Sequence, residues 1–518
     1  MWEQFYDPLN NIWLSALIAA IPILFFMLAS TAFTLPSYFT GISATIVAIG
    51  IAVLLYDMPL SKALMSALYG VLSGLYPVAT IVIAAIFLYK LTVKTGRFEI
   101  IKRSITSITS DKRVQVLLIA YCFGAFLEGA AGFGAPVAIT AVILIGLGFE
   151  PLKAAGLCLI ANIAGGSYGA MGIPVTTPAT LTGLNALDVA SYTSYIIPLI
   201  SLAVAFLLVY IVDGFKGIKE TYPSILVCGG TFALVQFIVL NVLGAVLVDI
   251  LSASISLIAL TLFEVLRSNT RKYNEDLKEV THAWLPFIIL TAMVILFSLD
   301  PIKNLFNSWV VDFPILGIHQ EIIRTSPVVT TNTPYNALFS VAFASTTVAI
   351  AIAGLITIWL FKIRSQTVKK AFNETINELK VPIITICSVL AFAYVSNFSG
   401  MSSTLGLALA NTGKVFPLFS PVLGWIGVFL TGSVVNSGSL FAPLQSITAQ
   451  QIGINQASMV ASNIMGGDMA KMISPQSIAV AAAAVGLTGK ENELFKYTIK
   501  ISVIFLAIVG ILNFVVNL

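Results

Sequence analysis

The sequence predicts an all-α polytopic membrane protein built from two inverted-topology repeats that contain broken helices or re-entrant hairpins. Three observations support this fold: the composition, the recurrence of apolar runs and a duplicated segment. Of the 518 residues, 58% are hydrophobic and only 10% are charged, whereas soluble proteins carry about 25% charged residues. The mean hydropathy is +0.97. Such a chain needs an apolar solvent around most of its surface.

Apolar runs long enough to cross a bilayer recur from one end of the chain to the other. A spanning helix needs roughly 20 such residues. Counting broken helices, we expect about a dozen or more spans in a multi-pass protein of the cell membrane. The clearest runs are 14–33, 39–56, 77–93, 192–212, 283–299, 336–361 and 495–516.

One segment of the sequence occurs twice. Residues 161–174 (ANIAGGSYGAMGIP) align without a gap with residues 462–475 (SNIMGGDMAKMISP), 301 positions later. Paired repeats with interrupted helices, meeting near the bilayer midplane, are typical of secondary transporters. We therefore divide the chain into four parts: N-terminal membrane helices 1–60, transport repeat 1 at 61–213, intervening membrane helices 214–365 and transport repeat 2 at 366–518.

The basic residues predict how the repeats lie relative to each other, because Lys and Arg prefer cytoplasmic loops. Loop 94–113 is rich in basic residues and its counterpart 399–416 is not, whereas loop 175–191 has none and its counterpart 476–500 has three. The bias changes sides, so the repeats are predicted to be inverted. The connecting loops agree: basic segments 214–222, 267–282 and 362–380 are expected inside, and the loop 300–335 outside.

A single acid marks the predicted break in repeat 1. Glu128 stands within the glycine-rich stretch 124–136 (GAFLEGAAGFGAP), which we interpret as the tip of a helical hairpin or broken helix. A carboxylate at that depth is costly and is usually functional. We predict that Glu128 couples transport to protons, and that the neighbouring backbone at Gly129, Gly132 and Gly134 contacts substrate. A structural carboxylate in a buried pair is the alternative.

The matching tip in repeat 2 has hydroxyl and amide groups in place of a charge. We expect Ser433, Asn436 and Ser437 to contact an anionic group at the half-helix ends. The alternative is that these small residues simply permit close helix packing.

The duplicated segments supply the remaining candidates. Asn162 and Asn463 could contact substrate or satisfy freed backbone groups at the breaks. Repeat 2 alone adds Asp468 and Lys471, which are spaced to share one helix face. We predict proton coupling at Asp468 and carboxylate binding at Lys471, with an ion pair to Asp468 or Glu128 as the alternative for Lys471. Polar groups at another expected break complete the predicted substrate-binding set: Ser474 and Gln476.

Several classes of function are disfavoured. The net charge of +4 is too small to indicate binding of nucleic acid. The four cysteines lie in apolar runs, which is typical of packed thiols and disfavours a disulfide-linked fold. The two histidines stand alone in predicted loops, so neither a histidine metal site nor a Ser–His or Cys–His catalytic pair is expected. No GxxxxGK[ST] phosphate loop occurs. We predict no enzyme activity, no metal and no cofactor.

Long stretches of the chain resemble the lactate permease family, which lies within the ion transporter superfamily of organic-anion carriers. The resemblance is carried by NNIWLSALIAAIPILFF (10–26), AFLEGAAGFGAPVAIT (125–140), GLCLIANIAGGSYGAMGIP (156–174), GWIGVFLTGS (424–433) and KMISPQSIAVAAAAVGLTGKENELF (471–495). It implies uptake of small 2-hydroxymonocarboxylates (L-lactate, D-lactate, glycolate) by proton symport across the cytoplasmic membrane. Carried over by position, Glu128 would be the intramembrane acid and Lys471 the intramembrane base.

The sequence departs from the family pattern at Val434, at Asp468 and at the pair Gly165-Gly166, where the family has bulkier residues or proline. The family has an acidic residue where this chain has Val434, and Asp468 occupies a place that is often neutral. These departures keep other readings open: a sodium-coupled or dicarboxylate transporter, and, less favoured, an anion channel.

Overall fold

The computed structural model describes residues 1–31, 35–130, 132, 135–267, 276–306, 309–329, 331–342, 345–488 and 490–518. It confirms an α-helical, multi-pass membrane protein. Among the described residues, eight helices are long and apolar enough to cross a membrane, or nine if the bent pair Pro151–Gly166 and Gly169–Thr182 counts as one span. This is fewer than the dozen expected, because several apolar segments form helices of only 10–17 residues.

The first 225 residues form a nearly continuous series of helices. Two helices precede the part assigned to repeat 1, and three segments of that part have π-helical or bent geometry rather than regular α-helix. The elements are β1 (Trp2–Glu3), α1 (Ile12–Thr31), α2 (Ser37–Leu54), α3 (Leu60–Ser73), η1 (Gly74–Ala79), α4 (Thr80–Lys94), α5 (Arg97–Thr106), α6 (Lys112–Val116), η2 (Leu117–Phe123), α7 (Gly124–Ala130), α8 (Ala135–Gly146), α9 (Pro151–Ala161), α10 (Ile163–Gly166), α11 (Gly169–Thr182), α12 (Ala186–Ser194) and α13 (Ile197–Ile225).

The middle of the chain adds further helices and short strands. Its elements are η3 (Leu226–Gly230), α14 (Thr231–Val242), α15 (Val248–Arg267), α16 (Leu277–Ser298), α17 (Asp300–Leu305), β2 (Val310–Pro314), β3 (Ile322–Arg324), β4 (Thr333–Pro334), β5 (Leu338–Ala342) and α18 (Thr346–Leu360). The last third is helical: α19 (Ser365–Phe398), α20 (Met401–Ala410), η5 (Gly413–Val415), α21 (Phe416–Thr431), α22 (Val434–Gln451), α23 (Gln456–Lys471), α24 (Pro475–Ala484) and α25 (Glu491–Val516).

The segment 300–335, expected as a loop, contains β2, β3 and β4, which form small sheets with β1 and with β5. β3 pairs in parallel with β1, which brings residues 2–3 beside residues 322–323, and antiparallel with β4. β2 and β5 form a separate antiparallel pair. The strands are short and polar loops join them, so hydropathy alone could not distinguish them from irregular chain.

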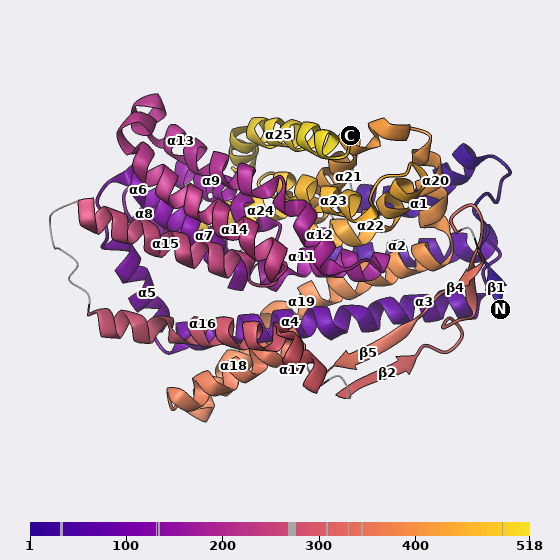
Figure 1. Ribbon diagram of the computed structural model, residues 1–518, viewed down its shortest axis with the longest axis horizontal. Helices are drawn as coiled ribbons and strands as arrows, with labels where there is room; N and C mark the ends of the chain where they lie inside the picture. Colours follow the sequence, from indigo (N-terminus) through magenta and orange to yellow (C-terminus); the bar gives the residue numbers. More distant parts are fainter. Residues whose placement is uncertain are drawn as a thin grey trace.

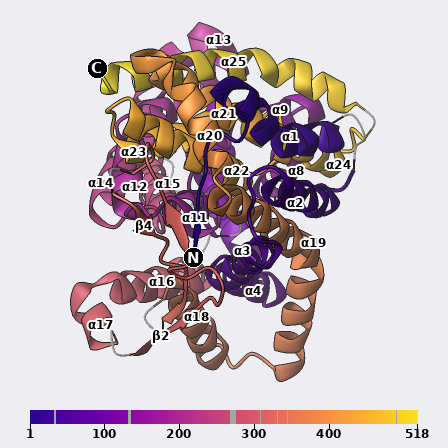
Figure 2. The same ribbon diagram turned by 90° about the vertical axis from the view of Figure 1, so that its right-hand side faces the viewer.

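The helices form two layers. In Figures 1 and 2, α3, α4, α16, α17 and α18 lie below the rest of the molecule, and α19 packs against both α3 and α4. Figure 1 shows β1, β4 and the N-terminus at the right-hand end, with β2 and β5 along the lower right edge. The basic α5 and the facing ends of α15 and α16 lie at the left-hand end. The basic segments predicted to face the cytoplasm therefore lie at the opposite end of the molecule from the segment 300–335, which is predicted to face outside.

The two halves of the molecule interlock reciprocally. α8 and α22 each follow a break and fold back against the helix before it, α8 on η2 and α7, and α22 on α21. α8 then packs against α24 of the other half, while α22 packs against α11. This exchange of equivalent contacts is the geometry expected of a duplicated unit. The repeat boundaries and the opposite membrane orientation of the repeats stay predictions.

The breaks occur where the sequence lacks ordinary helix formers. Between α10 and α11 the chain bends by 50°, and residues 170–172 adopt left-handed backbone with φ of 48°, 62° and 72°. Gly432 (φ +71°) ends α21 before Ser433 caps α22. Each break exposes backbone groups at membrane depth, where they are tolerated only if protein or a water-filled cavity covers them.

Candidate functional site

A buried ion pair joins the break in the first half of the molecule to the second half. Glu128 lies in the last turn of α7 and is 1% exposed, and its Oε1 accepts a hydrogen bond from Lys471 Nζ at the end of α23. The other carboxylate oxygen, Oε2, has no hydrogen-bond partner among the described residues. Of the two partners predicted for Lys471, the structure brings it to Glu128.

Asp468 lies one turn before Lys471 on α23 and is fully buried. Its Oδ2 accepts a hydrogen bond of 2.7 Å from the hydroxyl of Ser167, which stands at the equivalent position of the first half. Its Oδ1 has no described partner. The duplicated segments thus touch each other directly, at one of the two positions where they differ in charge.

The structure adds a third carboxylate that our reading of the sequence missed. Asp249 begins α15, is 1% exposed, and neither of its oxygens has a hydrogen-bond partner in the described part of the chain. It interacts electrostatically with Glu128, Lys471 and Asp468. Asp249 belongs to the intervening helices, where no repeat pattern draws attention to it. A lone acid inside the apolar run 246–263 was the available signal.

Three glycines make room for the three carboxylates. A methyl group added at Gly166 would overlap Asp468 Oδ1, and one at Gly169 would overlap Glu128 Oε1. At Gly165 the added methyl would lie 3.2 Å from Asp249 Oδ2. The glycine-rich backbone from α10 to the start of α11 therefore lies against all three carboxylates.

A small cavity of about 60 Å³ opens beside the ion pair. That volume equals the share of about two water molecules. Both halves line it: the first through the turns around Gly132 and Gly169, the second through the residues after Gly432. Its lining is Glu128, Gly132, Gly166, Gly169, Ala170, Pro174, Gly432, Ser433, Val434, Val435, Lys471, Gln476, Ser477 and Val480.

Several residues predicted to bind substrate make other contacts. Ser437 Oγ can donate to Gly424 O at 3.0 Å or to Asn463 Oδ1 at 3.3 Å, and these contacts tie α22 to α21 and α23. The Ser474 hydroxyl caps α24 by accepting from Ser477 N. Asn436 contributes its backbone N–H to the Ser433 cap. The contacts of Ser437 fit the close packing that was the alternative for this tip, and substrate binding by these residues stays a prediction.

The remaining predicted residues are placed as follows. Gly129 faces Asp249, since a methyl group there would lie 2.6 Å from Asp249 Cβ. Asn162 is buried where α9 meets α10, and Asn463 is fully buried with no described partner for its Nδ2. Neither asparagine lines the central cavity. Gly134 lies outside the described residues.

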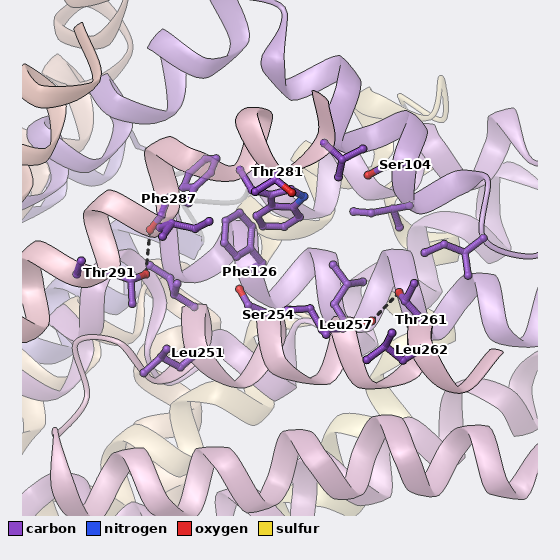
Figure 3. Close-up of a pocket in the computed structure, with 18 of the residues that line it drawn as sticks. Ser104, Phe126, Leu251, Ser254, Leu257, Thr261, Leu262, Thr281, Phe287 and Thr291 are labelled. Atoms are coloured by element: carbon purple, nitrogen blue, oxygen red, sulfur yellow. Dashed lines mark hydrogen bonds between the residues drawn. The ribbon is translucent and has the colours of Figure 1, made fainter. Parts of the chain in front are cut away.

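A larger cavity elsewhere is a poor match for an anion. It has a volume of about 650 Å³ and lies between α5, α15 and α16. Figure 3 shows its wall of aromatic and aliphatic side chains with a few hydroxyls, and none of the described residues that line it is charged. Phe126 packs there against Trp284 and Phe287. Such a lining suits hydrocarbon.

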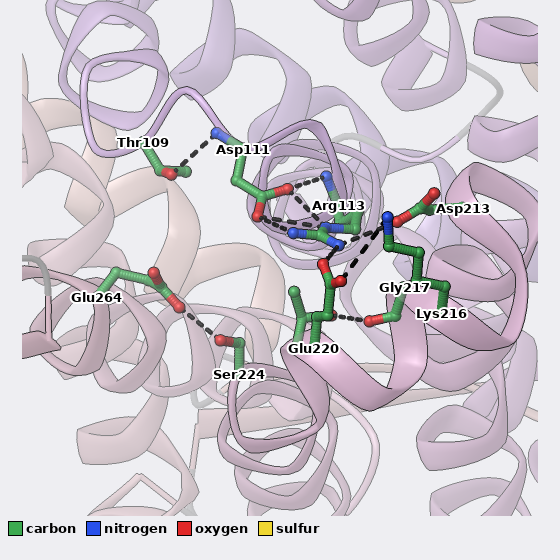
Figure 4. A network of polar contacts seen from close by, with 10 residues as sticks. Thr109, Asp111, Arg113, Asp213, Lys216, Gly217, Glu220, Ser224 and Glu264 are labelled. Carbon is green, nitrogen blue, oxygen red and sulfur yellow. Dashed lines mark hydrogen bonds and ion pairs between the residues drawn. The ribbon is translucent and has the colours of Figure 1, made fainter.

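A second charged cluster lies at the left-hand end of Figure 1. Arg113 contacts three carboxylates, Asp111 at 2.8 Å, Asp213 at 2.9 Å and Glu220 at 2.5 Å (Figure 4). Burial raises the pKa of Asp111, but the hydrogen bonds from Arg113 outweigh it and leave that pKa below its usual value. This cluster joins α6 to α13 at the surface and is separate from the central acids.

Buried charges at breaks between interlocking halves define the class of this protein: a multi-pass α-helical membrane permease. More particularly, the chain belongs to the L-lactate permease family, whose model matches residues 15–518. It is 48% identical to the L-lactate permease of Escherichia coli K12, covering 99% of this chain and 98% of that protein. It is 46% identical to the glycolate permease GlcA of the same strain, covering 99% and 97%. Among solved structures, the YdaH transporter of Alcanivorax borkumensis aligns with a TM-score of 0.47 at 14% identity, over 96% of this chain and 98% of that one.

Proposed function

We propose that this protein takes up small 2-hydroxymonocarboxylates, namely L-lactate, D-lactate and glycolate, by proton symport across the cytoplasmic membrane. The observation that supports it best is the buried pair of Lys471 and Glu128 beside a cavity lined by both halves. Relatives named L-lactate permease and glycolate permease supply the substrate class.

The ion pair provides a site for exchange between carboxylates. A substrate carboxylate that reaches Lys471 competes with Glu128 for the same ammonium group. A buried Glu128 that loses its partner carries an uncompensated charge, which costs several kcal/mol. Uptake of a proton removes that charge. Binding of one anion to Lys471 thereby favours binding of one proton to the site, which is the coupling that symport needs.

Two further acids offer places for protons next to this pair. If all four charged groups were ionised, three carboxylates would face one ammonium in a buried space. The cost of burying unpaired charge favours neutral Asp249 and Asp468 while Glu128 is paired. Either neutral acid can then donate its proton to Glu128 when Glu128 leaves Lys471. The acid that donated becomes ionised and takes up the transported proton in turn, so that the site ends with one more proton than it began with.

The cavity limits the substrate to a small acid. Besides the charged pair, it offers hydrogen-bonding groups at Ser433, Gln476 and Ser477 that could receive a 2-hydroxyl group. Its volume of about 60 Å³, the share of about two water molecules, is too small even for lactate, so we expect the two halves to part slightly when the substrate binds. Val434, in place of the acid expected there, keeps this wall uncharged and suits a substrate with a single carboxylate.

The test is transport by the purified protein in liposomes. We expect labelled lactate to accumulate under an inward proton gradient, and Glu128→Gln to abolish accumulation while counterflow exchange persists. Glu99→Gln, which changes a largely exposed acid of α5, is the matched control and should behave as the unaltered protein. Accumulation by Glu128→Gln at unaltered levels would remove Glu128 from coupling. Accumulation driven by a sodium gradient at uniform pH would instead favour sodium symport, and flux without counterflow would favour a channel.

A further inference from the structure

We propose that Arg324 forms a second anion site, an outer vestibule that captures the substrate carboxylate before it reaches Lys471. This inference rests on the proposed function, since it assigns the place where the same small monocarboxylate first binds. Arg324 ends β3, at the end of the molecule that the charge pattern predicts to face outside.

Arg324 lines a polar cavity of about 260 Å³. The walls come from the strand region, from α3, from α11 with the residues that follow it, and from α19 and α22. They carry hydroxyl and amide groups that can donate to a carboxylate, and Arg324 is the sole charged residue among the described residues of the lining. The polar members are Tyr69, Thr180, Thr182, Tyr335, Asn336, Asn397, Tyr394, Ser446, Gln450 and Gln456.

Within the described chain, the guanidinium group of Arg324 has no anionic partner. Its Nε is buried without a hydrogen-bond partner, and no carboxylate of the described chain forms an ion pair with it. The acid nearest in sequence, Glu321, is occupied by Lys62, whose Nζ lies 2.6 Å from Glu321 Oε2. The hydrogen bond from Lys62 lowers the pKa of Glu321, so that carboxylate stays ionised and paired.

The position of the guanidinium is fixed by stacking. Its Cζ lies 4.8 Å from the centroid of the Tyr335 ring, and Tyr335 in turn packs against Phe398 of α19. Stacking holds a guanidinium plane while leaving its edge free to form two parallel hydrogen bonds with a carboxylate. One cation with neutral donors around it matches an anion of single charge.

A second cavity leads from the vestibule along α11. It has a volume of about 210 Å³ and shares Tyr69, Thr180, Leu181 and Tyr394 with the vestibule. Thr177 of α11 also lines this second cavity, and its buried hydroxyl has no hydrogen-bond partner among the described residues. The other end of α11 supplies Ala170 and Pro174 to the central cavity. One helix therefore lines all three spaces between Arg324 and Lys471.

The decisive measurement is uptake kinetics from the side that carries the strands. Arg324→Gln should raise KM for external lactate about tenfold, the effect of losing about 1.4 kcal/mol of binding, while Vmax stays within about twofold. Arg324→Lys keeps the positive charge but not the planar guanidinium group that can form two parallel hydrogen bonds. We expect it to recover part of the lost affinity. KM for efflux from the opposite side should change much less.

The matched control is Arg97→Gln. Arg97 also stacks on an aromatic ring, with its Cζ 3.6 Å from the centroid of Phe361, but it lies at the opposite end of the molecule. It should leave external KM unchanged. An unaltered KM in Arg324→Gln, or a fall in Vmax alone, would show that Arg324 only supports the fold and would overturn the vestibule. Failure of the unaltered protein to transport lactate would instead overturn the proposed function.

Discussion

At the scale of single residues, three buried acids and one buried base make up the chemistry of the central site. Glu128, Asp468 and Lys471 could be predicted, because ionisable residues are rare in such an apolar chain and two of them stand in a duplicated segment. Asp249 could not be ranked in the same way. It begins a helix outside the repeats, where an acid is equally expected as a favourable partner of the helix dipole.

Removing one partner of the central ion pair should destabilise the protein. Lys471→Met leaves Glu128 buried without its cation, and breaking a buried pair costs about 3–5 kcal/mol. We expect the lower end, since Glu128 can take up a proton. The double variant Glu128→Gln/Lys471→Met should recover most of the stability in thermal unfolding of detergent-solubilised protein, with transport still absent. Additive losses in the double variant would mean that the two groups do not interact.

Asp249→Asn should separate exchange from coupling. Neither carboxylate oxygen has a described hydrogen-bond partner, so the amide of similar shape loses no known contact. We expect lactate counterflow to persist and accumulation under a pH gradient to fall, because one place for a proton is gone. Both activities should be compared in the same proteoliposomes. Accumulation equal to that of the unaltered protein would exclude Asp249 from the proton route.

At the scale of elements, the short pieces were hardest to predict from sequence. The hairpin tip or broken helix at 124–136 was anticipated from Glu128 and its glycines, and α8 does pack back against α7 and η2. The short helices α10 and α24 were not predicted as separate elements. Hydropathy identifies a span from about 20 apolar residues, and these helices are far shorter. The strands of 300–335 were missed for a similar reason.

The glycines at the bend are the most specific requirement among the elements. Gly166→Ala should abolish lactate transport, since the added methyl would overlap Asp468 Oδ1 and also lie 3.0 Å from Lys471 Cδ. The matched control is Gly50→Ala in α2, where nothing lies within 4 Å of the new methyl. That variant should be neutral or stabilising by up to about 1 kcal/mol. Full activity of Gly166→Ala would mean that the bend adjusts easily.

At the scale of the whole molecule, charge and strands mark opposite ends. The distribution of Lys and Arg predicted which loops lie together, and the structure places the basic ends away from the strands (Figure 1). Which end faces the cytoplasm still rests on the preference of basic residues for that side. The packing of intervening helices around Asp249 could not be read from the sequence, because no repeat or charge pattern sets it.

Thiol labelling in intact cells tests that orientation. Thr331→Cys and Asn373→Cys replace exposed residues, the first between the strands and the second on α19. The four natural cysteines are buried and should contribute little signal. A membrane-impermeant maleimide should label Thr331→Cys in intact cells and Asn373→Cys only after permeabilisation. The reverse pattern would invert the assigned orientation and place Arg324 at the inner face.

The contrast between the roomy space at Arg324 and the narrow chamber at Lys471 has a pharmacological consequence. A 2-hydroxy acid with a bulky aromatic substituent could occupy the outer space of about 260 Å³ but not the inner one of about 60 Å³. Such a compound should act as a blocker that competes with lactate from one face of the membrane and is never itself carried. Its failure to drive counterflow, together with inhibition from that face alone, would distinguish a blocker from an alternative cargo.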